Sequence, residues 1–326
     1  MRVRMVLPLV LICLVFIAGC GSAGRGDGAD RDGAGTETMG GTSAHTTAGE
    51  TTAAETSTEA TVGAEKEEPG STTATDQTGT GGKAESSGEG PFIASPESSG
   101  GEGFQADSIL AVRYGDHGGY ERVVLDLGTG SRPAGSIPEW KLTSPTGDGL
   151  LRVSLPSVSA TQVSDGKLGG KLLKDFHAVR GPDGGMFVDI VADEAFTYRV
   201  MELTDPARLV VDFKPSEMPL DMPLPAEGDK TVVTQPREGE RVGSSLTVSG
   251  YSRNFEGTNT IVLTDSGGEV IARKTVQAND WAVTWGYFET TLKAPSFSGR
   301  GTLRVGAESA RDGTFEGVEV PVRGSG

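Results

Sequence analysis

The chain has 326 residues, which on length alone is enough for two ordinary domains. Hydrophobic residues make up 35% of it and aromatic residues 6%, both low values, while its 49 glycines far exceed average usage. With 29 basic and 45 acidic residues its formal net charge is -16, which leaves no basic surface for nucleic acid or for an anionic bilayer. We therefore exclude nucleic acid as a partner.

The first twenty residues predict where the protein resides. Arg2 and Arg4 form a short basic head, and residues 5–17 form an apolar run of 13 residues. A bilayer core of ~30 Å is too thick for that run, but the run has the length of a signal-peptide core. It ends in Ile17-Ala18-Gly19-Cys20, which resembles a bacterial lipobox; an ordinary secretory signal that carries a cysteine is the alternative. We expect residues 1–19 to be a lipoprotein signal peptide and lipid on Cys20 to hold the protein at the extracytoplasmic face of the cell membrane.

Residues 20–103 are predicted to be the lipidated cysteine followed by a disordered linker. From residue 21 to residue 103 there are 15 acidic and 4 basic residues, many Thr, Ser, Gly and Ala, and a single aromatic residue, Phe92. Such a segment cannot bury enough apolar surface to offset the entropy lost on ordering. We interpret it as a tether that lifts the folded part away from the bilayer; a spacer without a length requirement is the alternative.

A pattern of alternating apolar and polar residues begins at Phe104 and predicts a mainly β region over residues 104–215. The predicted strands are rich in Val, Leu, Phe and Tyr and are separated by Gly, Pro and Asp turns. They span residues 109–114, 120–127, 150–155, 186–191, 196–203 and 208–213. Residues 163–173 are compatible with a helical turn.

An internal echo links the start and the end of this region. The run Arg122-Val123-Val124-Leu125-Asp126-Leu127 is repeated as Arg208-Leu209-Val210-Val211-Asp212-Phe213. In an extended strand the Arg and the Asp share one face and the larger apolar side chains share the other. We expect the outward charges to pair across neighbouring strands, at ~0.2–1 kcal/mol each; a charged face for a ligand is the alternative.

These paired strands, in a β region behind an export signal, resemble the AMIN and AMIN-like domains of bacterial envelope proteins. The resemblance covers about residues 106–215. It implies a sandwich of two small sheets and a role in localisation, often by contact with peptidoglycan.

Four prolines, Pro215, Pro219, Pro223 and Pro225, favour an extended connector over residues 216–228. Beyond it, a second set of short strands with Gly and Asp turns predicts an immunoglobulin-like sandwich over residues 229–326. These strands span residues 231–235, 246–250, 260–264, 270–276, 285–292, 303–307 and 318–322. Because each half has its own apolar alternation, we expect residues 104–218 and 226–326 to fold separately.

The second half carries ordered motifs of its own. They are Pro236-x-x-Gly239-x-x-Val242, Leu246-Thr247-Val248-Ser249-Gly250, Asn254-Phe255-Glu256-Gly257-Thr258, Phe288 and Ser309-Ala310-Arg311-Asp312-Gly313. Together they resemble the GerMN-associated immunoglobulin-like domain of bacterial sporulation and germination lipoproteins. The resemblance implies an extracytoplasmic binding or scaffold module without chemistry.

The most concentrated aromatic cluster predicts a ligand surface formed by Trp281, Trp285 and Tyr287. Trp281 follows Asn279-Asp280, which predicts a loop on which the ring can stack on a sugar. A tryptophan that closes the sandwich core is the alternative, and it is the favoured one for Trp285. We expect no enzyme, cofactor or metal site, because no nucleophile motif is present and the three histidines lie far apart in the sequence. A glycosidase-type pair of carboxylates is the remaining catalytic alternative.

We thus predict an all-β protein with two sandwiches, AMIN-like and then immunoglobulin-like, behind a disordered linker. The predicted function is that of a non-catalytic, lipid-anchored cell-envelope binding protein that docks on peptidoglycan or another wall glycan. The alternative is an extracytoplasmic scaffold that recruits an envelope protein or a sporulation or germination factor.

Overall fold

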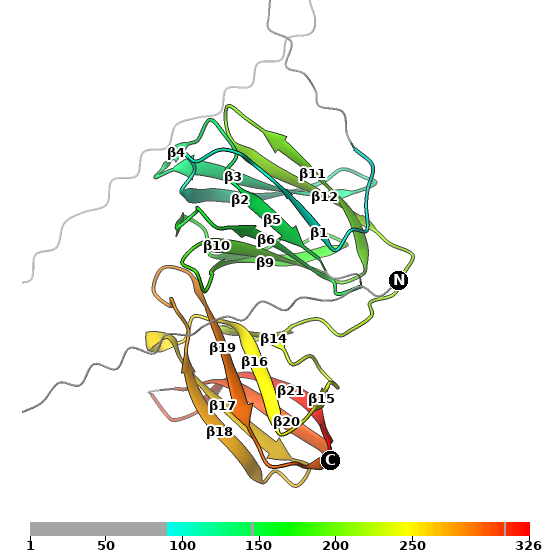
Figure 1. Cartoon of the computed structure of the whole chain (residues 1–326), viewed down its shortest axis with the longest axis vertical. Helices are drawn as coiled ribbons and strands as arrows, with labels where there is room; N and C mark the ends of the chain where they lie inside the picture. Colours follow the sequence, from blue (N-terminus) through cyan, green and yellow to red (C-terminus); the bar gives the residue numbers. More distant parts are fainter. Residues whose placement is uncertain (1–89, 145–146, 310) are drawn as a thin grey trace, which may run out of the picture. The chain divides into compact units, whose positions relative to one another are not determined.

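The computed structural model describes residues 90–144, 147–309 and 311–326 (Figure 1). The predicted signal peptide, Cys20 and the linker up to residue 89 lie outside the described residues. Within them the regular structure consists of strands and one short 3-10 turn, η1 (Phe255–Gly257), so the prediction of an all-β fold is confirmed. The described residues include no helix with the length and apolar character needed to cross a membrane.

The first half of the fold places two sheets around one core. One sheet has the strand order β11-β12-β3-β2-β7, with β4 beside β3, and the other begins β1-β5-β6-β10-β9, with β8 beside β9. Alternate side chains of both sheets, such as Val123 and Leu125 from one and Val188 and Ile190 from the other, meet in this core and are fully buried. The strands are β1 Glu97–Gly100, β2 Ser108–Asp116, β3 Glu121–Thr129, β4 Arg132–Pro133, β5 Trp140–Thr143, β6 Leu150–Leu155, β7 Ala160–Thr161, β8 Asp165–Lys167, β9 Leu173–Arg180, β10 Met186–Ala192, β11 Phe196–Leu203 and β12 Arg208–Pro215.

The two echo strands, β3 and β12, are antiparallel neighbours. Their register places Asp212 opposite Arg122. The Arg122 guanidinium donates to both Asp212 oxygens, at 2.6 and 2.9 Å, and Arg199 Nε donates to one of them at 2.7 Å. The predicted pairing of charges across neighbouring strands is therefore confirmed at this position, but Asp212 is fully buried and does not face solvent.

The second half is a second sandwich. One sheet has the order β19-β16-β14-β13 and the other β15-β21-β20-β17-β18, and side chains such as Val248, Phe288 and Leu303 fill the core between them. Each of the seven predicted strands of this half falls on a strand of the structure. The strands are β13 Ala226–Glu227, β14 Thr231–Gln235, β15 Arg241–Val242, β16 Ser245–Ser252, β17 Thr258–Asp265, β18 Val270–Gln277, β19 Trp285–Lys293, β20 Ser298–Glu308 and β21 Phe315–Ser325.

The two halves share one continuous sheet. Strand β9 pairs in parallel with β19, with Trp285 opposite Val179 and Gly286 opposite Arg180. A third apolar cluster lies at this junction and contains Val179, Phe187, Val232, Tyr251 and Trp285. Strand β10 is buried along its whole length because one of its faces lies on the first core and the other faces this cluster. The described residues of both halves thus belong to one compact unit. Separate folding of the halves stays a prediction.

Two sequence expectations are wrong in detail. Residues 93–103, expected to be disordered, pair with the first half: Ile93 bridges to Tyr198, β1 pairs with β5, and Gly103 bridges to Pro138. An edge strand is held by backbone hydrogen bonds, so it needs few apolar side chains to be ordered. The expected helical turn over residues 163–173 is instead β8, a turn with Gly169 at φ 67°, and the first residue of β9.

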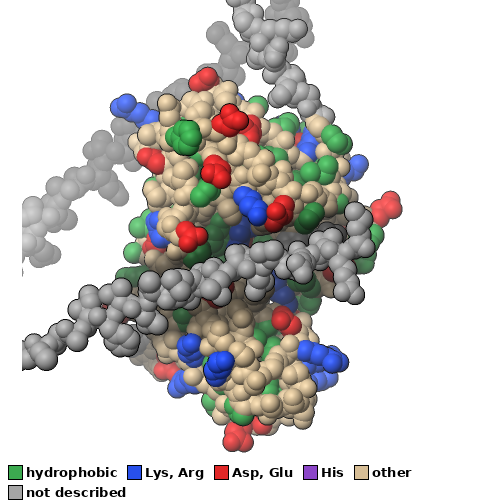
Figure 2. Space-filling view, viewed as in Figure 1, with side chains coloured by type: hydrophobic (Ala, Val, Ile, Leu, Met, Phe, Trp, Pro, Cys, Tyr) green, Lys and Arg blue, Asp and Glu red, His purple; other side chains and the backbone are tan. Residues whose placement is uncertain are grey.

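The surface carries charges of both signs. On the face shown in Figure 2, Lys and Arg side chains are interspersed with Asp and Glu side chains. Large apolar side chains are exposed in both halves, among them Phe104 in the first half and Phe255, Trp281 and Val283 in the second. The last three lie on two loops, one on either side of β17 and β18 in the sequence.

Candidate functional site

The candidate site is an exposed pair of aromatic rings on the second half. Phe255 lies in η1, between β16 and β17, and is 72% exposed, while Trp281 lies between β18 and β19 and is 39% exposed. The two ring centroids are 5.2 Å apart with an interplanar angle of 66°, an edge-to-face contact. We call Phe255 and Trp281 the aromatic surface. Large rings left exposed in contact with each other are typical of binding surfaces.

A buried hydrogen-bond network fixes the Phe255 loop. Asn254 Nδ2 donates to Thr231 Oγ1 at 2.9 Å and to Asn259 Oδ1 at 2.8 Å. Asn259 Nδ2 in turn donates to Ser252 Oγ at 2.9 Å and to the Gly257 carbonyl at 3.0 Å. All four of these polar side chains are buried, so breaking the network would leave donors and acceptors unpaired. Phe255 is therefore held outward by a rigid loop.

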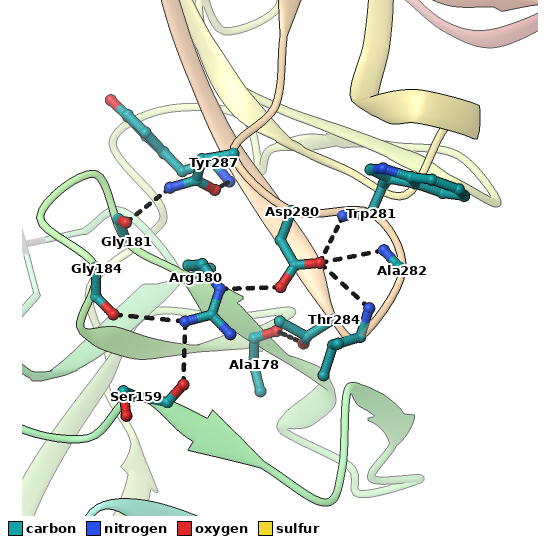
Figure 3. A network of polar contacts seen from close by, with 12 residues as sticks. Ser159, Ala178, Arg180, Gly181, Gly184, Asp280, Trp281, Ala282, Thr284 and Tyr287 are labelled. Atoms are coloured by element: carbon teal, nitrogen blue, oxygen red, sulfur yellow. Dashed lines mark hydrogen bonds and ion pairs between the residues drawn. The ribbon is translucent and has the colours of Figure 1, made fainter.

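One carboxylate organises the Trp281 loop (Figure 3). Asp280 Oδ1 accepts from the backbone N–H groups of Trp281, Ala282 and Val283 at 2.7, 3.1 and 3.2 Å, and Asp280 Oδ2 accepts from Arg180 Nε at 2.9 Å. Burial alone would raise the pKa of the Asp280 carboxyl. The hydrogen bonds from Arg180 and from the three N–H groups outweigh burial and hold that pKa below its usual range. The loop conformation is therefore supported at neutral pH.

A polar groove lies beside Phe255. It has a volume of about 710 Å³, and side chains that can hydrogen-bond to hydroxyl groups line most of it. Its polar lining is Lys230, Asn254, Glu256, Thr258, Thr260, Arg273, Thr275, Glu308, Ser309, Arg311 and Glu316. The basic groups are partly neutralised, since Lys230 pairs with Glu316 at 3.1 Å and Arg273 with Glu308 at 3.2 Å. An apolar ring beside a hydroxyl- and charge-lined groove suits a hydroxyl-rich ligand with one apolar face.

Trp285 and Tyr287 lie apart from the aromatic surface. Trp285 is 3% exposed, its ring meets His177 at 4.8 Å and Tyr251 at 5.7 Å, and its Nε1 donates to Asp165 Oδ1 at 3.1 Å. Trp285 is therefore buried where β9 and β19 pair, in agreement with the interpretation favoured from the sequence, and it also lines a cavity at the junction; its part in a ligand surface stays a prediction. Tyr287 is half-buried, and burial together with its hydrogen bond to Glu289 raises the pKa of Tyr287 to about 12. Trp281 lies on a loop, as the sequence predicts.

An open cavity at the junction brings ionisable groups together. It has a volume of about 480 Å³, and its lining includes Asp165, Lys167, Asp175, His177, Glu227 and Trp285. Burial lowers the pKa of His177, against the opposing charges of Asp175 and Glu227, so the imidazole is neutral at pH 7. Within the described ranges no three His, Cys, Asp or Glu side chains are placed to hold a metal ion.

Sequence reasoning missed Phe255, Arg180 and Asp280 as site residues. Phe255 is the one apolar residue in the turn Asn254-Phe255-Glu256-Gly257, and an aromatic residue in such a polar turn is a local pattern that could have indicated an exposed ring. Arg180 and Asp280 are 100 residues apart, so no local pattern relates them.

A comparison with family models matches residues 230–314 to the immunoglobulin-like domain of bacterial spore germination. No curated protein and no solved structure matches the chain. The matched residues include β14, η1 and β19, and therefore both loops of the aromatic surface. Residues 230–314 are thus similar to an immunoglobulin-like domain family, in agreement with the second sandwich of the structure.

Proposed function

We propose that this protein is a non-catalytic, lipid-anchored cell-envelope protein that docks on peptidoglycan or another wall glycan through the aromatic surface. The observation that carries the proposal is the exposed Phe255–Trp281 pair, in which Phe255 lies beside a groove lined by hydroxyl-bearing and charged side chains. Glycans offer apolar ring faces for stacking and hydroxyl groups for hydrogen bonding, which are the two kinds of contact this surface provides.

Charge supports a contact of this kind. Residues 104–326 contain 23 basic and 30 acidic residues, a balance of -7. Attraction between opposite charges is therefore a minor contribution to binding of an anionic wall polymer. Stacking and neutral hydrogen bonds are insensitive to ionic strength, so docking should persist in ~0.5 M salt, where surface charges are screened.

The predicted signal peptide and Cys20 support the location. A chain anchored by lipid at Cys20 would carry its folded part on an acidic linker of more than 70 residues, at a distance from the bilayer at which it could reach the wall.

The test is a pulldown of the full-length chain on purified wall sacculi. Trp281→Ala should weaken binding about tenfold (~1.4 kcal/mol), the scale of one lost ring contact in a binding surface. Phe104→Ala is the matched control, because Phe104 is 93% exposed and lies in the first half, away from the aromatic surface. It should leave binding unchanged.

A scaffold that recruits an envelope, sporulation or germination protein is the second candidate; an immunoglobulin-like sandwich without a catalytic motif is compatible with it. A scaffold would ignore purified sacculi at low salt and retain one protein from an envelope extract. Absence of sacculus binding at low salt would therefore contradict glycan docking.

A further inference from the structure

The loop that carries Trp281 belongs to the second half, but it is anchored to the first. Asp280 lies directly before Trp281, and its carboxylate accepts a hydrogen bond from Arg180, the last residue of β9. We infer that Arg180 is a positioning residue: through Asp280, the first half holds the Trp281 loop in the form that binds ligand. The inference rests on the proposed function, since it assigns the support of that same surface.

The Arg180 side chain is itself fixed. Its Nη1 donates to the Ser159 carbonyl at 3.0 Å and to the Gly184 carbonyl at 3.5 Å, while its Nε faces Asp280 (Figure 3). Both carbonyls belong to the first half. The guanidinium therefore joins the backbone of the first half to the carboxylate that organises the loop.

Both ends of the loop are tied to the first half as well. At its start, Asn279 Nδ2 donates to the Gly181 carbonyl at 2.7 Å. At its end, the buried Thr284 hydroxyl donates to the Ala178 carbonyl at 2.6 Å. The acceptors flank Arg180 in the sequence, so a single stretch of the first half, residues 178–181, contacts the loop at its start, middle and end.

The loop also folds back closely over its own strand. A Cβ atom at Gly286 would lie 2.1 Å from the Asp280 carbonyl oxygen and 2.3 Å from the Asp280 nitrogen. Only glycine permits this approach, and Gly286 is the residue that pairs with Arg180 between β19 and β9. The loop, the strand pairing and the ion pair therefore form one arrangement.

The consequence is that the aromatic surface needs both halves. The Trp281, Ala282 and Val283 N–H groups converge on Asp280, so a shift of Asp280 moves all three residues. Without Arg180, Asp280 loses the one side-chain hydrogen bond that it makes among the described residues, and the middle of the loop is no longer held to the first half. Trp281 then loses its fixed position against Phe255, and a ligand has to order the loop on binding.

The tryptophans provide a readout that is independent of ligand. The chain has three, of which Trp140 and Trp285 are buried and Trp281 is exposed. Quenching of fluorescence by acrylamide therefore reports mainly on Trp281. A purely structural ion pair would change the melting temperature without changing this quenching selectively.

The test uses the full-length chain with Arg180→Met, which keeps most of the apolar stem and removes the charge. Lys141→Met is the matched control, since Lys141 forms an exposed ion pair with Glu97 in the first half. We expect Arg180→Met to raise acrylamide quenching and to weaken sacculus binding by about fivefold to tenfold, comparable to Trp281→Ala. Arg180→Lys should recover part of the binding, and Lys141→Met should change neither quantity.

Asp280→Asn is the second variant, for the case that Arg180→Met unfolds the junction. Its amide oxygen can still accept from the three loop N–H groups, but the ion pair is lost, so quenching should rise while the fold remains. Wild-type quenching and wild-type sacculus binding in the variant that folds would overturn the inference. If Trp281→Ala binds sacculi like the wild type, the proposed function fails, whereas the quenching result still decides whether Arg180 positions the loop.

Discussion

Truncation of two tryptophans that are close in sequence, Trp281 and Trp285, should change the free energy of unfolding by very different amounts. Trp285 is 3% exposed and packs edge-on against His177 and Tyr251, where the two halves meet. Replacing a buried Trp or Phe by alanine costs about 3–5 kcal/mol. The lost indole donor to Asp165 accounts for about 1 kcal/mol of such a cost. We expect Trp285→Ala to lower the free energy of unfolding by ~4 kcal/mol.

Trp281→Ala should cost far less, within ~0.5 kcal/mol, because its ring is largely outside the packed cores. Trp285→Phe should lie between the two, since it keeps apolar volume at the junction and loses the N–H donor. Urea unfolding of the full-length chain, followed by circular dichroism, measures all three variants against the wild type. Comparison at equal m-values is required for the free energies to be comparable.

A decrease of less than ~1 kcal/mol in the free energy of unfolding of Trp285→Ala would contradict the burial of this side chain at the junction, because truncating a buried indole costs several times more. An equal loss of unfolding free energy in Trp281→Ala and Trp285→Ala would contradict the exposed position of Trp281. In that case Trp281 would belong to the packed structure and could not be a surface ligand contact.

The remaining predictions concern the junction and the anchor. Arg237 and Asp148 form a buried ion pair across the junction, with Arg237 Nη2 2.9 Å from Asp148 Oδ1. Arg237→Met leaves the Asp148 carboxylate buried without a partner and should lower the free energy of unfolding by about 3 kcal/mol, measured in urea. The double variant Asp148→Leu/Arg237→Met should recover most of that loss, because no unpaired charge stays buried. Burial raises the pKa of Asp148 to about 6, so the folded state holds this proton more tightly than the unfolded chain. As the pH rises from about 4 to about 6, the wild type should therefore lose stability relative to Asp148→Asn. A stability difference between the two that does not change with pH would contradict this prediction. Residues 90–218 and 226–326 should each give β-type circular dichroism with a cooperative melt, and a random-coil spectrum of either fragment would contradict the predicted boundary. Each fragment should melt at a lower temperature than the full chain, because the burial of each junction side chain, such as Phe187 and Tyr251, contributes ~1.5–3 kcal/mol that the fragment loses. Cys20→Ser should abolish partitioning into the detergent phase, and undiminished partitioning would refute the lipid anchor.

Strand positions were predictable where one face of a strand is apolar and the other polar. The run Arg122–Leu127 and its echo Arg208–Phe213 follow this rule, and the structure pairs them as β3 and β12. The register then brings Arg122 to Asp212, which the shared spacing of Arg and Asp in the two runs anticipates.

Strand β9 was missed because it breaks the rule. Its polar residues Asp175 and His177 are buried, since they face the junction instead of solvent. A strand whose two faces are both covered shows no alternation of apolar and polar residues. The covering comes from the second half, more than 70 residues along the chain, and no local pattern contains that information.

The same limit applies to the candidate site. The exposed position of Trp281 follows from the Asn279-Asp280 turn before it, which is a local signal. The support of the loop does not, because Arg180 meets Asp280 only when β9 and β19 pair. The edge-to-face contact of Trp281 with Phe255 likewise needs the fold that brings two loops together.

The central claim is that the aromatic surface docks on wall glycan, and sacculus binding by the full-length chain tests it most directly. Binding of the wild type, Trp281→Ala and Phe104→Ala should be measured at low salt and at ~0.5 M salt. The account predicts wild-type binding at both salt concentrations, a loss of about tenfold for Trp281→Ala with an unchanged melting temperature, and no loss for Phe104→Ala. Equal binding by wild type and Trp281→Ala, or no binding by either at low salt, would contradict it.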